Sequence, residues 1–371
     1  MMLSQLLISF VSLVDIGMVG RLGTEEQAAV GYATQFHFLT QSVFFAIGFA
    51  CVARMARAIG GGDLERARQA LAAALVLAPG AGLIFAGLIG LFPVTILGWL
   101  GASDTVAALC APYLRLTMLS SLLLAVALTV ESGLRADRDT KTSMRIAVFV
   151  TATKVALNAL LIFGLWGFPR LELVGAGLAT LASQGIALVL FGIVLKRARE
   201  DGPLALRLRH FTQVREFIRE GGEFRRLARL AYPSIIERVG MNLALLVFFA
   251  VLSGYGAVAI ASYTVGIRLL SFSWIPGIGY AQAVATLVGQ SIGRNDLGAA
   301  RHAGWRAARL AVGTALVMGI LGAWLRVPLA ELFSRDPATI ATLVPFMLAM
   351  CLCQPTLQLH FTLAGAHRGA G

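Results

Sequence analysis

The sequence predicts an all-α membrane protein with about ten transmembrane helices, and three observations indicate this class. Apolar residues make up 58% of the 371 positions. Charged residues make up 13%, about half the usual share of a soluble domain. Apolar runs long enough to cross a bilayer recur between short polar segments. A soluble enzyme, a nucleic-acid-binding module and a disordered scaffold are therefore excluded.

The apolar runs place the predicted spans in order along the chain. The first run is already apolar at its start and lacks the basic start and small-residue cleavage site of a signal peptide. We therefore interpret it as a membrane helix. The ten predicted spans cover residues 2–20, 28–52, 70–98, 106–134, 146–167, 173–195, 229–253, 258–290, 304–325 and 338–366.

The loops between these spans alternate between basic and poorly charged. Roughly 23 of the 31 Lys and Arg lie in or beside one set of loops, and about four lie in the other set. Cytoplasmic loops of membrane proteins are the ones enriched in Lys and Arg. We therefore expect the basic loops and both visible termini to be cytoplasmic, where the net charge of +12 faces anionic lipid rather than nucleic acid.

The four cysteines all lie in apolar runs. They are Cys51, Cys110, Cys351 and Cys353. The one close pair is separated by a single residue, so its members lie on different faces of a helix. The sequence predicts neither a disulfide framework nor a metal site.

The longest polar stretch separates six predicted spans from four. It carries Gly202, Pro203, Gly221 and Gly222, residues typical of linkers. The predicted organisation is an N-terminal lobe (1–195), a basic cytoplasmic linker (196–228) and a C-terminal lobe (229–371).

The two lobes share an internal repeat at an offset of 233 residues. Without gaps, IGGGDLERAR, ending at Arg68, aligns with IGRNDLGAAR, ending at Arg301. In both copies glycine closes a long helix and an acid caps the next one. Duplicated bundles are typical of transporters, with the substrate path between the halves. A second bundle that copied the first would have six spans, and four are visible.

Three segments resemble the multidrug and toxic compound extrusion (MATE) family. They are VDIGMVGRLGTEEQAAVG at 14–31, GFPRLELVGAGLAT at 167–180 and GQSIGRNDLGAAR at 289–301. The resemblance covers essentially the whole chain and implies a twelve-helix fold of two six-helix lobes. It also implies a bacterial inner-membrane antiporter that exports organic cations in exchange for protons or sodium ions. The chain resembles a fragment, since it begins within the first helix and lacks two further helices.

Ionisable residues inside predicted spans are candidate functional groups, because each costs free energy in lipid. The resemblance assigns cation coupling to Asp15. Desolvation makes a carboxylate hold its proton near neutral pH, as a proton carrier requires. Lys154 and Asn158 lie one helical turn apart and share a face. Asn158 matches the family pattern, whereas Lys154 replaces an asparagine and acts as a tuning charge or extends toward the cytoplasmic surface.

Further polar residues in the spans are candidates for the substrate cavity. Gln35, His37 and Gln41 lie among aromatic residues that suit an aromatic cation. Glu237 and Arg268 in the second lobe form either an inter-helix ion pair or part of the cavity. The second-lobe acids of NorM-type relatives are missing, so a second-lobe sodium site has little support. Because a sodium ion cannot readily enter beside a charged Lys154 facing Asp15, we expect proton rather than sodium coupling. Pro276 predicts a kink in the span at 258–290.

Several alternatives remain open from the sequence. Lys154, Arg115 and Arg268 also suit a lipid-linked sugar flippase of the related superfamily, and an inactive truncated fragment is a further reading. No loop holds the catalytic cluster of a membrane-embedded transferase, and no phosphate-binding loop indicates ATP hydrolysis. We therefore expect no enzyme activity and no cofactor besides the coupling ion. The expected partners are a small organic cation and the lipid bilayer, without nucleic acid, and the expected state is a monomer.

Overall fold

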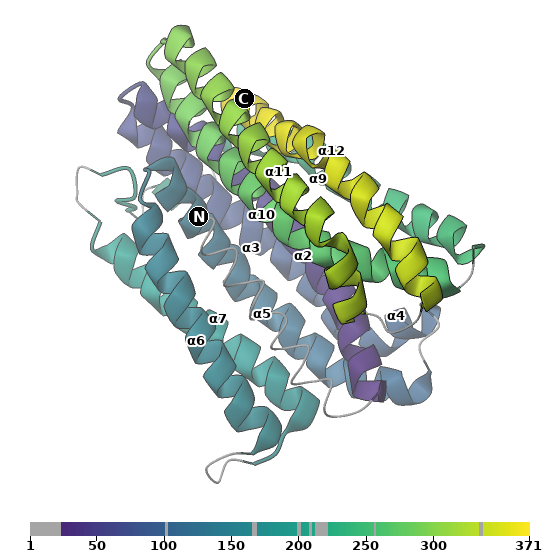
Figure 1. Cartoon of the computed structure of the whole chain (residues 1–371). Helices are drawn as coiled ribbons and strands as arrows, with labels where there is room; N and C mark the ends of the chain where they lie inside the picture. The colour runs from purple at the N-terminus through teal and green to yellow at the C-terminus, as the bar shows by residue number, and fades with distance from the viewer. Residues whose placement is uncertain are drawn as a thin grey trace. The chain divides into compact units, whose positions relative to one another are not determined.

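The computed structural model describes residues 24–100, 103–164, 169–198, 202–207, 210–211, 222–255, 257–333 and 337–371. Throughout these residues the regular structure is helical (Figure 1). The chain divides into two compact units, one reaching to Ile235 and the other covering Ile236–Gly371. The predicted span at 2–20 lies outside the described residues.

The first unit is organised around one central helix, α5. This helix packs against α2, α3, α4, α6 and α7, and α6 and α7 also pair with each other (Figure 1). The described helices of this unit are α2 (Thr24–Gly60), α3 (Leu64–Leu91), α4 (Pro93–Trp99), α5 (Asp104–Ala136), α6 (Thr140–Phe163), α7 (Glu172–Lys196) and the first part of α9 (Glu223–Ser253). One buried cluster surrounds Leu114 and another surrounds Leu134 of the same helix.

The second unit contains the rest of α9 with α10 (Ala257–Gly293), α11 (Leu297–Phe333) and α12 (Pro337–Ala370). Helix α12 packs along both α10 and α11. Gly365 and Gly369, one turn apart on α12, lie directly against the backbone of Ala281 and Ala285 of α10. Small residues at such spacing let membrane helices approach closely, which maximises dispersion contacts where lipid offers no hydrophobic driving force.

Seven of the described helices are long and apolar enough to cross a membrane: α2, α3, α5, α6, α7, α11 and α12. Most extend beyond the predicted spans, since hydropathy locates the apolar part of a helix while capping decides its ends. Helix α11, for example, runs over 37 residues, whereas the predicted span covered only residues 304–325.

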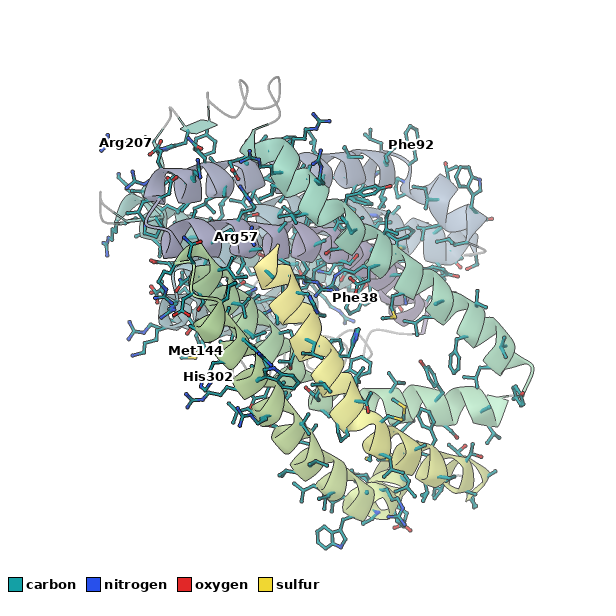
Figure 2. All side chains as sticks on the ribbon, turned by 90° about the horizontal axis from the view of Figure 1, so that it is seen from above. Phe38, Arg57, Phe92, Met144, Arg207 and His302 are labelled. Carbon is teal, nitrogen blue, oxygen red and sulfur yellow. The ribbon has the colours of Figure 1, made fainter. Side chains whose placement is uncertain are left out.

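The predicted span at 70–98 is wrong as a single helix. Helix α3 ends at Leu91, and α4 begins at Pro93 after Phe92. Proline has no N–H to donate to the preceding turn but suits the first turn of a new helix. The break lies at one end of the first unit and Arg207 lies at the other (Figure 2). Pro276, by contrast, lies inside the continuous helix α10.

Three turns between helices share one set of backbone hydrogen bonds. In each turn a residue in the left-handed region follows the end of a helix, and an aspartate then caps the next helix. The left-handed residues are Gly62 (φ 77°), Arg138 (φ 64°) and Asn295 (φ 60°). The caps are Asp63 Oδ1 with the Arg66 N–H (3.0 Å), Asp139 Oδ1 with the Thr142 N–H (3.1 Å) and Asp296 Oδ1 with the Ala299 N–H (2.8 Å).

The first and third of these turns are the two copies of the repeat. In one copy the amides of residues 61, 62 and 63 donate to the carbonyls of residues 57, 59 and 58. In the other copy the amides of 294, 295 and 296 donate to the carbonyls of 290, 292 and 291. Each number differs by 233, so the duplication in sequence is also a duplication in hydrogen bonding.

The described part of the predicted linker belongs to the first unit and packs against its helices. The Arg68 guanidinium donates to the Gly202 carbonyl (3.0 Å), and the buried His210 ring contacts Glu65 (3.1 Å). Leu204 and Leu206 join the apolar contacts beside α3. This part of the segment is therefore attached to the α2–α3 turn.

Candidate functional site

The predicted coupling residues on α6 lie inside the first unit. Asn158 is 2% exposed and Lys154, one turn earlier, is half-buried. The charge of Lys154 acts on the imidazole of His37, which comes from α2. Helices α2 and α6 are not among the closely packed pairs of the unit, so these side chains come from helices whose backbones are not in close contact.

The α2 residues proposed for the cavity divide between two faces. His37 and Gln41 are half-buried and one turn apart, hence on one face. Gln35 is exposed, and two residues from His37 it points to a different side of the helix. His37, on which the charge of Lys154 acts, thus shares a face of α2 with Gln41, whereas Gln35 lies on another face. Asp15 lies outside the described residues.

The second-unit candidates belong to two helices, Glu237 to α9 and Arg268 to α10. Glu237 on α9 accepts two hydrogen bonds from the Arg368 guanidinium near the end of α12, at 2.9 and 3.1 Å. Both side chains are partly exposed. Arg268 belongs to α10, and its side chain lies outside the described residues.

Arg115, one of the cations considered for a flippase, caps the broken helix. Its Nε donates to the Gly90 carbonyl at 3.3 Å. Helix α3 ends at the next residue, so the carbonyls of its last turn lack partners from a continuing helix. A guanidinium there satisfies one of them and complements the negative end of the helix dipole. This contact gives Arg115 a structural role.

Two buried ionic clusters at the ends of helices were not predicted from the sequence. Arg54 of α2 makes a bidentate pair with Glu223 at the start of α9 (2.5 and 2.9 Å), and Glu223 is 6% exposed. In the other cluster, Glu131 accepts from Arg135 (2.5 Å) and from the Ser143 hydroxyl (3.0 Å). The i, i+4 spacing of Glu131 and Arg135 was a usable signal. The sequence contains no comparable signal for the Arg54–Glu223 pair, because the two residues are 169 positions apart.

A third missed feature is a pair of buried glutamines on α12. Gln354 and Gln358 are each 1% exposed. They lie one turn apart within a helix apolar enough to cross a membrane, which is itself a signal, because polar groups inside membrane spans are rare. Among the described residues, no group of three or more His, Cys, Asp or Glu could hold a metal ion.

Comparison with known proteins identifies the family. The MatE family model matches residues 1–160 and 233–371. A FAD transporter of Shewanella oneidensis is 27% identical over 342 residues, which cover 91% of this chain and 73% of the relative. A probable multidrug resistance protein NorM of Thermotoga maritima is 26% identical over 362 residues, which cover 96% of this chain and 75% of the relative.

A solved structure shows the same fold. The crystal structure of a MATE protein in the bent conformation superposes with a TM-score of 0.88 at 20% identity, covering 100% of this chain and 80% of the other. The family match spans most of the sequence, and the apolar helices make this a multi-pass membrane protein. Members of the family are transporters rather than enzymes. The chain belongs to the MATE family of efflux transporters.

Proposed function

We propose that the chain is a secondary antiporter that exports organic cations across the bacterial inner membrane in exchange for protons. The observation that carries this proposal is the placement of polar and ionisable side chains on membrane-spanning helices of the first unit: Lys154 is half-buried and Asn158 buried on α6, and His37 is half-buried on α2. Ionisable groups in a membrane interior are costly and mark ion or substrate pathways. Three polar groups from two helices that do not pack closely suit such a pathway.

In the proposed mechanism Asp15 carries the proton, Asn158 supports it by a hydrogen bond and Lys154 tunes it. Two unit charges 4 Å apart attract by roughly 4 kcal/mol at an effective dielectric constant near 20. Such attraction between Lys154 and Asp15 would disfavour a sodium ion, which must enter beside a fixed positive charge. A proton can neutralise the carboxylate and release the pair.

In the same proposal His37 and Gln41, with Gln35 nearby on the helix, contact the substrate, and Glu237 and Arg268 serve the second lobe. Imidazole and carboxamide groups can hydrogen-bond an organic cation without holding it as tightly as a carboxylate would. Weak binding suits a transporter, because the substrate must also leave. No cofactor, metal ion or nucleic acid takes part, and a monomer suffices.

Transport by the full chain in liposomes tests this proposal. With an imposed proton gradient, we expect ethidium transport that Asp15→Asn abolishes. Lys154→Asn should shift the pH optimum or admit sodium as the coupling ion. Lys141→Asn is a matched control, since Lys141 is an exposed lysine near the start of the same helix, and it should leave transport unchanged. Sodium-driven transport that ignores pH in the unmutated chain would overturn the assignment.

The proposed orientation has the basic turns and both visible termini in the cytoplasm. Single cysteines at the exposed positions Thr105 and Lys141 test it in a cysteine-free background. An impermeant thiol reagent added to whole cells should modify the residue at 105 and spare the one at 141. The reverse pattern would invert the topology.

A second candidate function is export of a flavin nucleotide. The observation that favours it is the FAD transporter of Shewanella oneidensis, which is similar to this chain over 91% of its length. Efflux of FAD from loaded liposomes, compared with ethidium under the same gradient, distinguishes the two substrates. Transport of FAD without ethidium would replace the organic cation in the proposal.

A further inference from the structure

Three polar groups inside the second unit have unused hydrogen-bonding capacity. Both amide atoms of Gln354, the Oε1 atom of Gln358 and the indole Nε1 of Trp274 are buried without a partner in the described structure. Buried polar atoms in folded proteins nearly always have partners, so each exception needs an explanation. The need is greater in a membrane, where lipid offers no alternative partner.

These groups belong to neighbouring parts of two packed helices. Gln354 and Gln358 lie one turn apart on the face of α12 that is buried in the unit. The Nε2 atom of Gln358 donates to the Ser273 carbonyl of α10, and its side chain lies against Gly277. Trp274 follows Ser273 in the chain. Gln358 therefore lies at the contact between α10 and α12, with Gln354 one turn before it on the same face of α12.

We propose that Gln354 and Gln358 form a hydrogen-bonding subsite for uncharged planar heterocycles that carry an amide or imide edge. A carboxamide offers one acceptor and two donors side by side. It matches the C=O and N–H of a ring amide, which offers the complementary pair. None of Gln354, Gln358, Trp274 and Ser273 is charged, so the cluster gives an ammonium ion no electrostatic preference. The subsite rests on the proposed export function, since it assigns a second substrate class to the same transporter.

The proposed subsite is closed to solvent in this structure, so a ligand can bind only after a local opening. In this conformation neighbouring atoms shield the unpaired polar atoms from solvent, so a ligand reaches them when α10 and α12 separate locally. Opening gains hydrogen bonds that the closed state lacks. A ligand that supplies them binds the open state selectively and shifts the population toward it.

Binding of lumichrome to the purified full chain tests the subsite. Lumichrome is fluorescent, planar and uncharged, and its ring carries an imide edge; in its 1,3-dimethyl derivative both ring N–H groups of that edge are blocked. We expect the fluorescence anisotropy of lumichrome to report saturable binding, and the dimethyl derivative to bind at least tenfold more weakly. Equal affinity for the two probes, or no saturable binding of either, would overturn the proposal without any mutation.

The variants Gln354→Met and Gln358→Met keep side-chain length and remove the amide. Each should weaken lumichrome binding about tenfold or more, whereas Gln282→Met, at a buried glutamine of α10 outside the cluster, should leave it unchanged. Gln354→Met should also raise the melting temperature, because it removes an unsatisfied polar group. A higher melting temperature with unchanged affinity would mean that Gln354 has no binding role.

The binding assay needs no ion gradient, so its outcome is independent of the coupling mechanism. Failure of proton-driven ethidium transport alongside the expected lumichrome pattern would remove the antiport proposal and leave the subsite. Proton-driven transport with no discrimination between the two probes would remove the subsite alone.

Discussion

The two copies of the repeated turn have the same backbone and different surroundings. Both the α2–α3 turn and the α10–α11 turn place a left-handed residue before a capping aspartate. At the first turn Leu64 is half-buried, and Glu65 and Arg68 contact residues of the linker. At the second turn Leu297 is 71% exposed. A few local residues determine the conformation of this turn. Whether other residues pack over the turn depends on a segment more than 130 residues away in the chain.

The same contrast applies to the two ion pairs of α9. The helix begins in the first unit, where Glu223 is buried with Arg54, and ends in the second, where Glu237 meets Arg368 with both side chains partly exposed. Removing one partner of a buried pair leaves an uncompensated charge, whereas an exposed pair is replaced by water. The two pairs should therefore differ in energetic weight although their geometries are similar.

The largest expected effect is the loss of stability when the acidic partner of the buried ion pair is removed. Glu223→Ala should lower the free energy of unfolding by about 3 kcal/mol, since Arg54 then remains largely buried without its partner. Glu237→Ala is the matched control and should cost less than about 1 kcal/mol. Unfolding in mixed detergent micelles measures both. Equal losses would show that burial does not separate the two pairs.

A second effect concerns the left-handed residue of the turns. Gly62→Ala should cost about 1–2 kcal/mol, because a Cβ atom disfavours positive φ. Asn295→Gly at the equivalent position of the second copy, and Arg138→Gly in the α5–α6 turn, should instead stabilise by up to about 1 kcal/mol. The melting temperatures of the three variants, compared with that of the unmutated protein, show whether each substitution stabilises or destabilises the fold. Stabilisation by Gly62→Ala would contradict the shared conformation.

Substitution of the capping aspartates tests more sharply whether the two copies of the turn contribute equally to stability. Asp63→Ala and Asp296→Ala should each lower the free energy of unfolding by about 1 kcal/mol, since each removes one N-cap hydrogen bond. A clearly larger loss at Asp63 would mean that the linker adds to the energetic role of the first turn. Asp→Asn at either position is the control, because asparagine caps almost as well.

The smallest effect depends on pH and comes from the α5–α6 turn. Asp137 is an exposed residue, but partial desolvation, and then the charge of Asp139, raise its pKa above the ordinary value. The folded state thus binds this proton more tightly than the unfolded state, and stability falls as the pH rises from the ordinary pKa through the raised one. Asp137→Asn should therefore raise the melting temperature at pH 7.

This gain should disappear at pH values below the ordinary aspartate pKa, where Asp137 is protonated in both states. Asp139→Asn is the contrasting control. The Asp139 carboxylate accepts from the Thr142 N–H (3.1 Å) and hydroxyl (2.6 Å), so its substitution should not stabilise the protein at neutral pH. A pH-independent gain at Asp137 would show that its charge is not the cause.

The sequence by itself determined the helical membrane class, the family and the conformation of the repeated turns. Each depends on local or periodic information: apolar runs long enough to cross a bilayer, Gly62 or Asn295 where positive φ is needed, and an aspartate where a helix begins. The placement of Lys154 and Asn158 on one face of α6 follows from helix geometry in the same way.

Only the tertiary structure decided which of these groups meet. It broke the predicted span at Phe92 and used Arg115 to cap the break. It also joined Arg54 to Glu223 across 169 residues and buried the amide of Gln354 without a partner among the residues that the structure describes. The physical reason is that helical periodicity fixes the face on which a side chain lies but carries no information about the helix that covers that face. Pairing and burial follow from the packing of distant segments.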